Sequence, residues 1–241
     1  MKTFVLLPAY NEAKTITYLI KEVKQLGLDA VVVDDGSLDK TAAYAEEAGA
    51  IVLKHPENKG KGQAMRTGFD YAIKNNFDAV IIMDSDGQHA PEEINSFKNA
   101  IKNNDAGIIV GNRMHNPQGM PWVRKLTNMF MSFFISKLIG YNVPDSQCGF
   151  RMIKTDILKV IDLSTGKGKY DTESEILIEA ARKGFKIESV PIKTIYTDQT
   201  SKIHPVRDTI RFWRLIIKSV FKKNKLHFKI INNQETITKK H

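Results

Sequence analysis

The chain has 241 residues, 42% of them hydrophobic and 26% charged, which excludes a mainly disordered protein and fits one large domain or two small ones. The net charge of +9 is uneven, because residues 202–241 hold 11 Lys+Arg against 2 Asp+Glu while the other residues hold 25 of each sign. Such a basic tail indicates a polyanionic partner, either nucleic acid or an anionic membrane, or else a solvated charged surface.

Short apolar runs alternate with helical patterns along the first half of the chain. The runs that predict strands are residues 3–7, 30–33, 50–53, 79–83 and 106–110. The segments with helical spacing are residues 12–26, 39–48 and 63–74, a helix that opens at Pro91, and the apolar residues 121–139. Strands that are apolar throughout and separated by helices predict an α/β fold with a mainly parallel sheet and helices on both faces.

Two features of the sequence bear on the cellular compartment. Cys148 is the only cysteine, which excludes an internal disulfide and fits a reducing compartment. The apolar run at the start is too short for a signal peptide, and no stretch reaches the roughly 18 to 20 apolar residues of a spanning helix. We therefore expect a cytoplasmic protein.

Four of the predicted strands end in polar motifs, which read PAYNE, DDGS, DSDGQ and GNR. Ligands of open α/β sheets bind outside the carboxyl ends of the strands, so we expect a binding site there. The glycine fingerprint of dinucleotide-binding folds and the Walker phosphate loop are both missing from the sequence. An EF-hand is excluded too, because His89 and Asn95 stand where that loop needs Gly and Glu.

The DSDGQ motif predicts a metal site. Asp84 and Asp86 close a predicted strand, Gly87 permits a turn, and Gln88 adds a neutral oxygen. These hard ligands suit Mg²⁺ or Mn²⁺ and leave coordination positions open for substrate phosphate oxygens. The same pattern also serves as a turn that caps the next helix, but the neighbouring PAYNE and DDGS motifs favour the metal. His89 is interpreted as polar surface and is left out of the site.

The motifs LLPAYNE, VVVDDGS, NKGKGQAMRTG, IIMDSDGQH and QCGFRM, in this order, resemble those of the family 2 glycosyltransferases with the GT-A fold. Within that family they look most like the dolichyl- or polyprenyl-phosphate sugar transferases of the dolichyl-phosphate mannose synthase type. The resemblance implies a GT-A (Rossmann-like) domain over residues 1–200. It also implies inverting transfer from a nucleotide-diphosphate sugar, GDP-mannose or a UDP-sugar, with the metal ligands Asp84, Asp86 and Gln88 facing the diphosphate.

The resemblance also assigns residues to the nucleotide sugar. These positions are Pro8, Ala9, Tyr10, Glu12, Asp34, Asp35, Lys61 and Ser85. Tyr10 offers an aromatic face, and Glu12 and Asp35 can accept hydrogen bonds from ribose hydroxyls or base N–H groups. Lys61 stands in a Gly-flanked loop, from which its ammonium can assist departure of the diphosphate.

A phosphate acceptor would need cations rather than a general base, because its second pKa near 6 leaves it ionised at neutral pH. Arg113 ends the fifth predicted strand, which we expect beside the strand of the metal site. It matches an acceptor-phosphate arginine of the resembled enzymes, and Arg124 and Lys202 are further candidates for the same phosphate. Arg151 is interpreted as a structural ion-pair partner.

Two stretches suit a lipid surface. Residues 121–139 contain Trp122 and several Leu, Met and Phe residues, and from Pro205 onward apolar and basic residues recur with parallel helical steps. We predict that residues 201–241 form a basic amphipathic helix and tail. With a polyprenyl (dolichyl or undecaprenyl) phosphate as acceptor, the enzyme would be peripheral on the cytoplasmic face of an anionic membrane.

Two other functions stay open. Asp145 and Glu173 match acidic positions of the family, and either would serve as catalytic base, Asp145 first, if the acceptor were a sugar or protein hydroxyl. A basic nucleic-acid-binding protein belongs to a different class. The balanced charge of residues 1–201 and the lack of interleaved aromatic and basic residues on the strands argue against nucleic acid as a partner.

Overall fold

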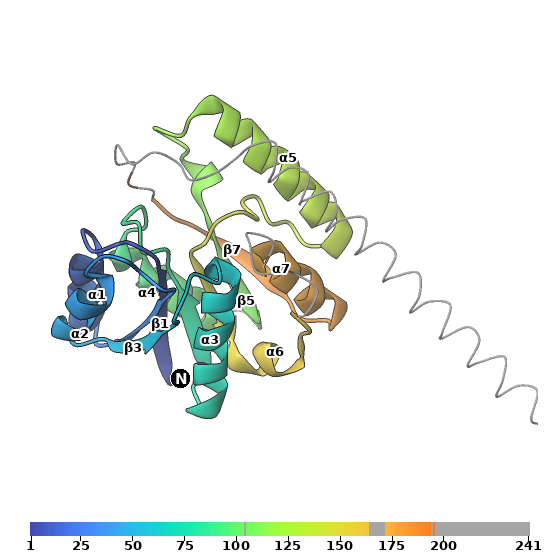
Figure 1. Cartoon of the computed structure of the whole chain (residues 1–241). Helices are drawn as coiled ribbons and strands as arrows, with labels where there is room; N and C mark the ends of the chain where they lie inside the picture. Colours follow the sequence, from blue (N-terminus) through green and yellow to red (C-terminus); the bar gives the residue numbers. More distant parts are fainter. Residues whose placement is uncertain (104, 164–171, 194, 196–241) are drawn as a thin grey trace, which may run out of the picture. The chain divides into compact units, whose positions relative to one another are not determined.

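The computed structural model describes residues 1–103, 105–163, 172–193 and 195, and within them seven strands form one sheet (Figure 1). The spatial order of the strands is β3-β2-β1-β4-β6-β5-β7. Their bounds are β1 Thr3–Ala9, β2 Asp29–Asp34, β3 Ile51–Lys54, β4 Ala79–Ile82, β5 Ile108–Asn112, β6 Arg151–Lys154 and β7 Ile187–Pro191. The expected mainly parallel sheet is confirmed.

One strand of the sheet runs against the others. β1 pairs in parallel with β2 and β4, β2 with β3, and β5 with β7, whereas β6 lies antiparallel between β4 and β5. The prediction that the Arg113 strand is the neighbour of the metal strand is therefore wrong. β6, which begins at the last residue of QCGFR, lies between them. The carboxyl ends of β1, β2, β4 and β5 still share one edge.

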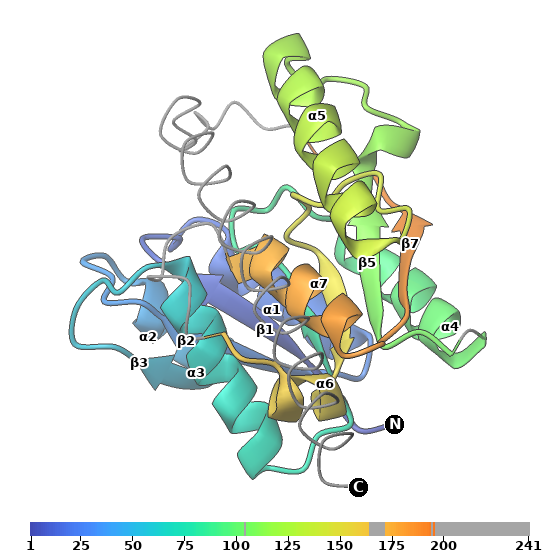
Figure 2. The same cartoon turned by 90° about the vertical axis from the view of Figure 1, so that its right-hand side faces the viewer.

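Helices cover the sheet on both sides. Their bounds are α1 Ile16–Gln25, α2 Thr41–Glu47, α3 Lys61–Lys74, α4 Ile94–Asn103, α5 Trp122–Ile139, α6 Thr155–Val160 and α7 Thr172–Arg182, with short 3-10 helices η1 Pro91–Glu93 and η2 Arg113–His115. In Figure 2, α3, α6 and α7 lie in front of the sheet, and α1 and α2 lie behind it. Right-handed crossovers between parallel strands place α1 and α3 on opposite faces, since the strand order reverses between them.

The apolar pattern of the sequence explains the core. α1 buries Ile16, Leu19, Ile20 and Val23, the residues whose spacing predicted one helix face. The central strands β1, β2 and β4 are buried almost throughout because helices cover them on both faces. Full burial of such an aliphatic side chain contributes roughly 1.5–3 kcal/mol to the stability of the fold. These strands therefore form a stable support for the loops that follow them.

Element ends differ from the predicted ones where they bear on function. α3 begins at Lys61, two residues earlier than predicted, so Lys61 opens a helix rather than standing in a loop. The predicted strand 106–110 is shifted to Ile108–Asn112, which puts Arg113 in the first turn after the strand. Gly60, with a φ of 90°, allows the chain to turn sharply into α3.

Several predictions concern parts of the chain outside the described residues. Lys202 and the predicted amphipathic helix from Pro205 belong to this group. The domain division into residues 1–200 and 201–241 therefore stays a prediction.

Candidate active site

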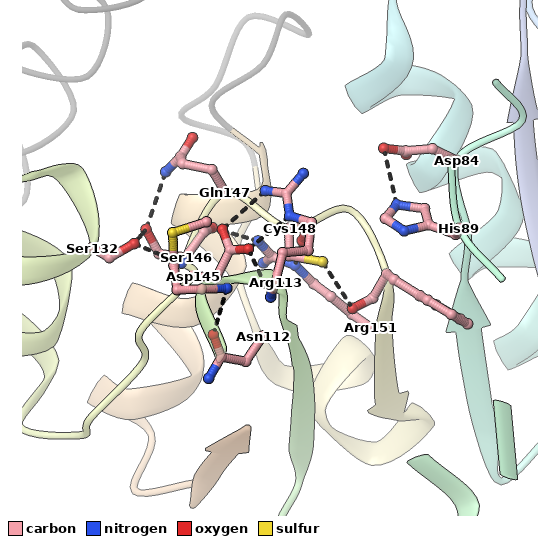
Figure 3. A network of polar contacts seen from close by, with 12 residues as sticks. Asp84, His89, Asn112, Arg113, Ser132, Asp145, Ser146, Gln147, Cys148 and Arg151 are labelled. Carbon is pink, nitrogen blue, oxygen red and sulfur yellow. Dashed lines mark hydrogen bonds and ion pairs between the residues drawn. The ribbon is translucent and has the colours of Figure 1, made fainter. Parts of the chain in front are cut away.

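A cluster of charges surrounds Asp84, two residues beyond the end of β4. Asp84 Oδ1 lies 2.6 Å from Lys61 Nζ at the start of α3, and Asp84 Oδ2 lies 3.6 Å from His89 Nε2 (Figure 3). Lys61 Nζ also lies 2.8 Å from Glu173 Oε1 in the first turn of α7. Lys61 thus joins two carboxylates that are distant in sequence.

This geometry holds both Asp84 and Lys61 in their charged forms. Burial by itself raises the pKa of the Asp84 carboxyl, but the Lys61 ammonium and the contact with His89 outweigh burial and hold that pKa far below its ordinary value. Burial lowers the pKa of Lys61, but Asp84 and Glu173 together raise it well above its ordinary value. Asp84 is therefore a carboxylate at neutral pH, as a metal ligand must be.

Gly149 leaves the space in which the Asp84 carboxylate lies. A Cβ at position 149 would come within 2.3 Å of Asp84 Oδ2 and 2.6 Å of Asp84 Cγ. Gly149 belongs to the QCGFR motif just before β6, the strand that pairs with β4. The antiparallel return of the chain therefore puts a residue without a side chain against the carboxylate.

The side chains of DSDGQ fit a divalent cation by their chemistry. Asp84, Asp86 and Gln88 are all half-buried, and Asp86 Oδ1 accepts a hydrogen bond from the Gln88 backbone N–H at 3.0 Å across the Gly87 turn. No group of three or more His, Cys, Asp or Glu side chains among the described residues is arranged to enclose a metal. Two carboxylates and one amide suit a cation that completes its shell with water and phosphate oxygens.

His89 is not polar surface, and that interpretation is wrong. Its exposed fraction is 2%, and its ring centroid lies 5.1 Å from that of Phe150. The histidine is buried because the chain after Gly87 turns inward toward β6 rather than outward. The buried ring of His89 therefore lies against the Asp84 carboxylate.

The nucleotide-sugar candidates of the first strand lie beside this cluster. Pro8 and Ala9 end β1, and Tyr10 follows them with 36% of its surface exposed. Ser85 Oγ donates a hydrogen bond to the Pro8 carbonyl at 2.8 Å, so the PAYNE and DSDGQ motifs are directly joined. The Glu12 backbone N–H donates to Thr41 Oγ1 at 2.8 Å.

The two acids of DDGS have different surroundings. Asp35 Oδ1 accepts from the Lys59 backbone N–H and contacts His55 Nδ1 at 2.7 Å, while Asp35 Oδ2 accepts from the Gly60 N–H at 2.7 Å. Asp34 Oδ1, in contrast, is buried without a hydrogen-bond partner among the described residues. Of the pair, Asp34 is the acid with an oxygen available to a ligand, and Asp35 orders the loop that leads to Lys61.

Two residues that join these loops, His55 and Asn11, were not predicted as site residues from the sequence. His55 contacts Asp35 and, through Nε2, Thr67 Oγ1 at 2.9 Å. Asn11 adopts a positive φ of 56° and accepts a hydrogen bond from the Leu38 N–H, which ties PAYNE to DDGS. Asn is enriched among residues with positive φ, so the Asn in PAYNE could have indicated a tight turn at this position. The role of His55 depends on contacts distant in sequence, which no local pattern contains.

Arg113 and Asp145 form a buried pair beyond β5. Arg113 Nε donates to Asp145 Oδ2 at 2.7 Å and Nη2 donates to Asp145 Oδ1 at 2.9 Å (Figure 3). The exposed fraction is 4% for Arg113 and 0% for Asp145. Asp145 therefore orients the guanidinium plane and neutralises its charge.

Arg151 is structural, although not in the predicted way. It is fully buried and its guanidinium donates to the backbone carbonyls of Cys148, Ser146 and Glu173. The hydrogen bonds go to carbonyls rather than to a carboxylate, because the 146–148 loop and the start of α7 both direct backbone carbonyls toward the Arg151 side chain. Arg151 thereby holds the QCGFR loop against the start of α7.

The helix α5 has its polar residues inside and many apolar residues outside. Among its residues, Asn128, Ser132 and Ile135 are buried, and Ser132 Oγ accepts from the Ser146 backbone N–H at 2.8 Å. The exposed large apolar residues of the helix are Trp122, Val123, Leu126, Met129, Phe130 and Phe133. Arg124 is half-buried on the same helix. Within the described part of the chain, no helix has the length and hydropathy needed to cross a membrane.

These features define a class of protein: a mainly parallel α/β domain whose strand ends carry an Asp-x-Asp pair and a buried aspartate with one unpartnered oxygen, beside a lysine that opens α3. Residues 4–162 match the family described as Glycosyl transferase family 2, and the chain belongs to that family. The resemblance found in the sequence motifs is confirmed, and the protein is a glycosyltransferase.

Two relatives with named activities are similar to this chain over most of its length. The chain is 36% identical over 216 residues to the UDP-N-acetylglucosamine–dolichyl-phosphate N-acetylglucosaminyltransferase of Methanococcus voltae, which covers 81% of this chain and 86% of that protein. It is 31% identical over 206 residues to the polyprenol monophosphomannose synthase of Mycolicibacterium smegmatis, with 79% and 76% covered.

A solved structure supports the fold. The glucosyl-3-phosphoglycerate synthase of Mycobacterium tuberculosis, solved in complex with Mn²⁺, uridine diphosphate and phosphoglyceric acid, superposes with a TM-score of 0.69 at 19% identity. The match covers 92% of this chain and 78% of that one. The expected GT-A fold is thus confirmed.

Proposed function

We propose that this glycosyltransferase moves a sugar, with inversion, from a nucleotide-diphosphate sugar to a polyprenyl phosphate. The observation that supports a phosphate acceptor over a hydroxyl acceptor is the burial of Asp145 in its pair with Arg113. A hydroxyl acceptor needs a base, and this carboxylate is already committed to a guanidinium. A phosphate acceptor needs none, because it is ionised at neutral pH. The names of the relatives agree with a lipid-phosphate acceptor.

We assign the donor diphosphate to the edge of β4. Asp84, Asp86 and Gln88 hold Mg²⁺ or Mn²⁺, which supplies a Lewis acid for the charge that develops on the leaving diphosphate. Lys61 adds a cation beside Asp84. The remaining assigned positions are Pro8, Ala9, Tyr10, Glu12, Asp34, Asp35 and Ser85. Asp34, with its unpartnered oxygen, accepts from the nucleoside, and Asp35 acts indirectly through the 55–60 loop.

We assign the acceptor phosphate to cations of the segment from β5 to α5. Arg113 contributes a guanidinium whose plane Asp145 fixes. Because Asp145 neutralises Arg113, Arg124 at the start of α5 carries more of the phosphate's charge. Lys202 is a third candidate and lies outside the described residues.

We further propose that the enzyme works as a peripheral protein on the cytoplasmic face of an anionic membrane. The exposed apolar side chains of α5 support this, because an amphipathic surface of aromatic and aliphatic groups suits the boundary between headgroups and acyl chains. The basic residues 202–241 would add attraction to anionic lipid. This arrangement brings a lipid-linked phosphate to Arg124 without removing the lipid from the membrane.

The rival function is transfer to a sugar or protein hydroxyl with Asp145 as base. Glu173, the other candidate base, is held by Lys61 at 2.8 Å and serves as its counter-ion. Neither carboxylate is therefore placed as an uncommitted base. The basic nucleic-acid-binding alternative is set aside, because the chain is a family 2 glycosyltransferase.

The deciding experiment offers the purified enzyme, Mn²⁺ and a panel of sugar nucleotides that includes GDP-mannose and UDP-sugars. The acceptor is either a polyprenyl phosphate or the corresponding polyprenol. We expect product with the phosphate only, with a rate that rises with ionisation of the phosphate near pH 6. Glycosylation of the alcohol at an equal rate, abolished by Asp145→Asn, would replace this proposal by the hydroxyl rival.

A further inference from the structure

Lys61 contacts an oxygen that the proposed metal site also needs. Its Nζ lies 2.6 Å from Asp84 Oδ1 and 2.8 Å from Glu173 Oε1, with 26% of the lysine side chain exposed. An ammonium and a divalent cation are both attracted to this oxygen and repel each other at short range. Each therefore weakens the contact of the other with Asp84 Oδ1.

Resting on the proposed function, we infer that Lys61 competes with the divalent cation for Asp84, and that Glu173 retains the ammonium when the cation binds. Lys61 is then a positioning residue with two partners. It contacts Asp84 and Glu173 before the metal enters, and Glu173 and the donor diphosphate afterwards. Metal uptake and donor binding become coupled, because the diphosphate gives the displaced ammonium a new partner.

Glu173 is suited to this role because its position does not depend on the metal loop. It comes from the first turn of α7, an element separate from β4 and from the loop that carries Asp84. Its backbone carbonyl accepts a hydrogen bond from Arg151 Nη1 at 2.5 Å, and Arg151 is itself fully buried. A shift of Asp84 toward a metal therefore leaves Glu173 in place to hold Lys61.

The test measures Mn²⁺ binding without nucleotide at neutral pH, from the loss of the electron paramagnetic resonance signal of free Mn²⁺. We expect Lys61→Met and Lys61→Gln to tighten Mn²⁺ binding roughly three- to tenfold. The substitution removes the ion pair that competes with Mn²⁺ for Asp84, and the gain is modest because solvent partly screens that pair. Lys59→Met is the matched control. It removes the same charge from the same segment, but the Lys59 side chain is exposed. Circular dichroism confirms that each variant folds.

A double-variant cycle tests the role of Glu173. Glu173→Gln should weaken Mn²⁺ binding when Lys61 is present, because the displaced ammonium loses its second partner. The same substitution should leave Mn²⁺ binding unchanged in the Lys61→Met background. An equal effect in both backgrounds would mean that Glu173 acts on the metal through space, and its proposed role would be wrong.

The possible failures can be told apart. If Asp84→Asn removes Mn²⁺ binding but Lys61→Met binds Mn²⁺ no tighter than Lys59→Met does, the competition is wrong and the metal site stands. If Asp84→Asn leaves Mn²⁺ binding intact, the metal site itself is wrong and the competition fails with it. Transfer activity gives a separate readout, because Lys61→Met should lower the activity while it increases the affinity for Mn²⁺.

Discussion

At the scale of single residues, Arg113 combines a structural and a proposed binding role. Its guanidinium is bonded to Asp145 through two nitrogen atoms, and both side chains are nearly inaccessible. Removing one partner of such a pair leaves a buried charge without compensation, which costs more than the pair contributes in net terms. The pair is therefore sensitive to geometry and not only to charge.

Replacing Arg113 by Lys should lower activity although the charge is kept. Lysine cannot form the planar two-point contact, so Asp145 is left partly unsatisfied and the acceptor phosphate loses its oriented donor. We expect a loss in kcat/KM for the lipid acceptor of roughly tenfold or more, with the donor KM little changed. The control is Arg182→Lys in the i,i+3 pair with Glu179, a contact near the end of α7. A donor KM that rises as much as the acceptor KM would contradict the assignment.

Two glycines at crowded positions should respond differently to substitution by alanine. At Gly149 the new Cβ would meet the Asp84 carboxylate at 2.3 Å, and at Gly68 it would meet Leu6 Cδ1 at 2.3 Å. Gly149→Ala should displace a side chain at the site and weaken Mn²⁺ binding. Gly68→Ala should instead strain the packing of α3 on β1 and lower the free energy of unfolding by about 1–3 kcal/mol. Metal titration and thermal denaturation of both variants separate the two effects, and equal metal affinities would refute this difference.

At the scale of elements, α5 departs most from the usual amphipathic pattern. Asn128 and Ser132 point inward because Ser132 and Ser136 fasten the helix to the 143–146 loop through backbone hydrogen bonds. The larger apolar side chains are left on the outside. Figure 1 shows α5 along the border of the domain, away from the central strands.

An acidic substitution on the outer face of α5 should weaken membrane binding without loss of stability. Phe133 is 57% exposed, so Phe133→Glu removes apolar area from a lipid contact but little from the core. We expect vesicle affinity to fall roughly tenfold. Val160→Glu on α6 is the control, because Val160 is 48% exposed on another helix. Sedimentation with vesicles gives the comparison, and equal losses for both variants would remove α5 from the membrane contact.

At the scale of the whole molecule, charge is divided between a neutral body and a basic tail. Residues 202–241 hold 11 basic and 2 acidic residues, so electrostatic attraction to the proposed anionic membrane would be concentrated there. Attraction between exposed charges is screened within about 8–10 Å at physiological salt. The apolar contact that we propose for α5 would not be screened in this way, so salt can separate the two contributions.

Binding of the full chain to vesicles should therefore depend on both lipid charge and salt. We expect strong sedimentation with anionic vesicles at low salt, and a weaker remainder at high salt that comes from apolar contact. Neutral vesicles should give only that remainder at every salt concentration. Equal binding to neutral vesicles and to anionic vesicles at low salt would contradict the electrostatic role of residues 202–241.

The sequence alone was sufficient for the α/β class, for five of the seven strands of the sheet, for the family and for the DSDGQ motif. These depend on local signals: apolar runs, helical spacing of residues such as Ile16 and Leu19, and turns that need Gly87. These local patterns predict the fold correctly because the apolar residues that form the runs are the same residues that become buried when helices cover both faces of the sheet.

Only the tertiary structure decided which charges meet. The antiparallel entry of β6 between β4 and β5 brings Gly149 against Asp84, and α7 brings Glu173 to Lys61. The tertiary structure also places His89 in the interior and pairs Arg113 with Asp145, which is 32 residues away in sequence. Pair energies depend on distance and burial, and these are set by strands and helices packing from remote parts of the chain. A linear motif contains neither quantity.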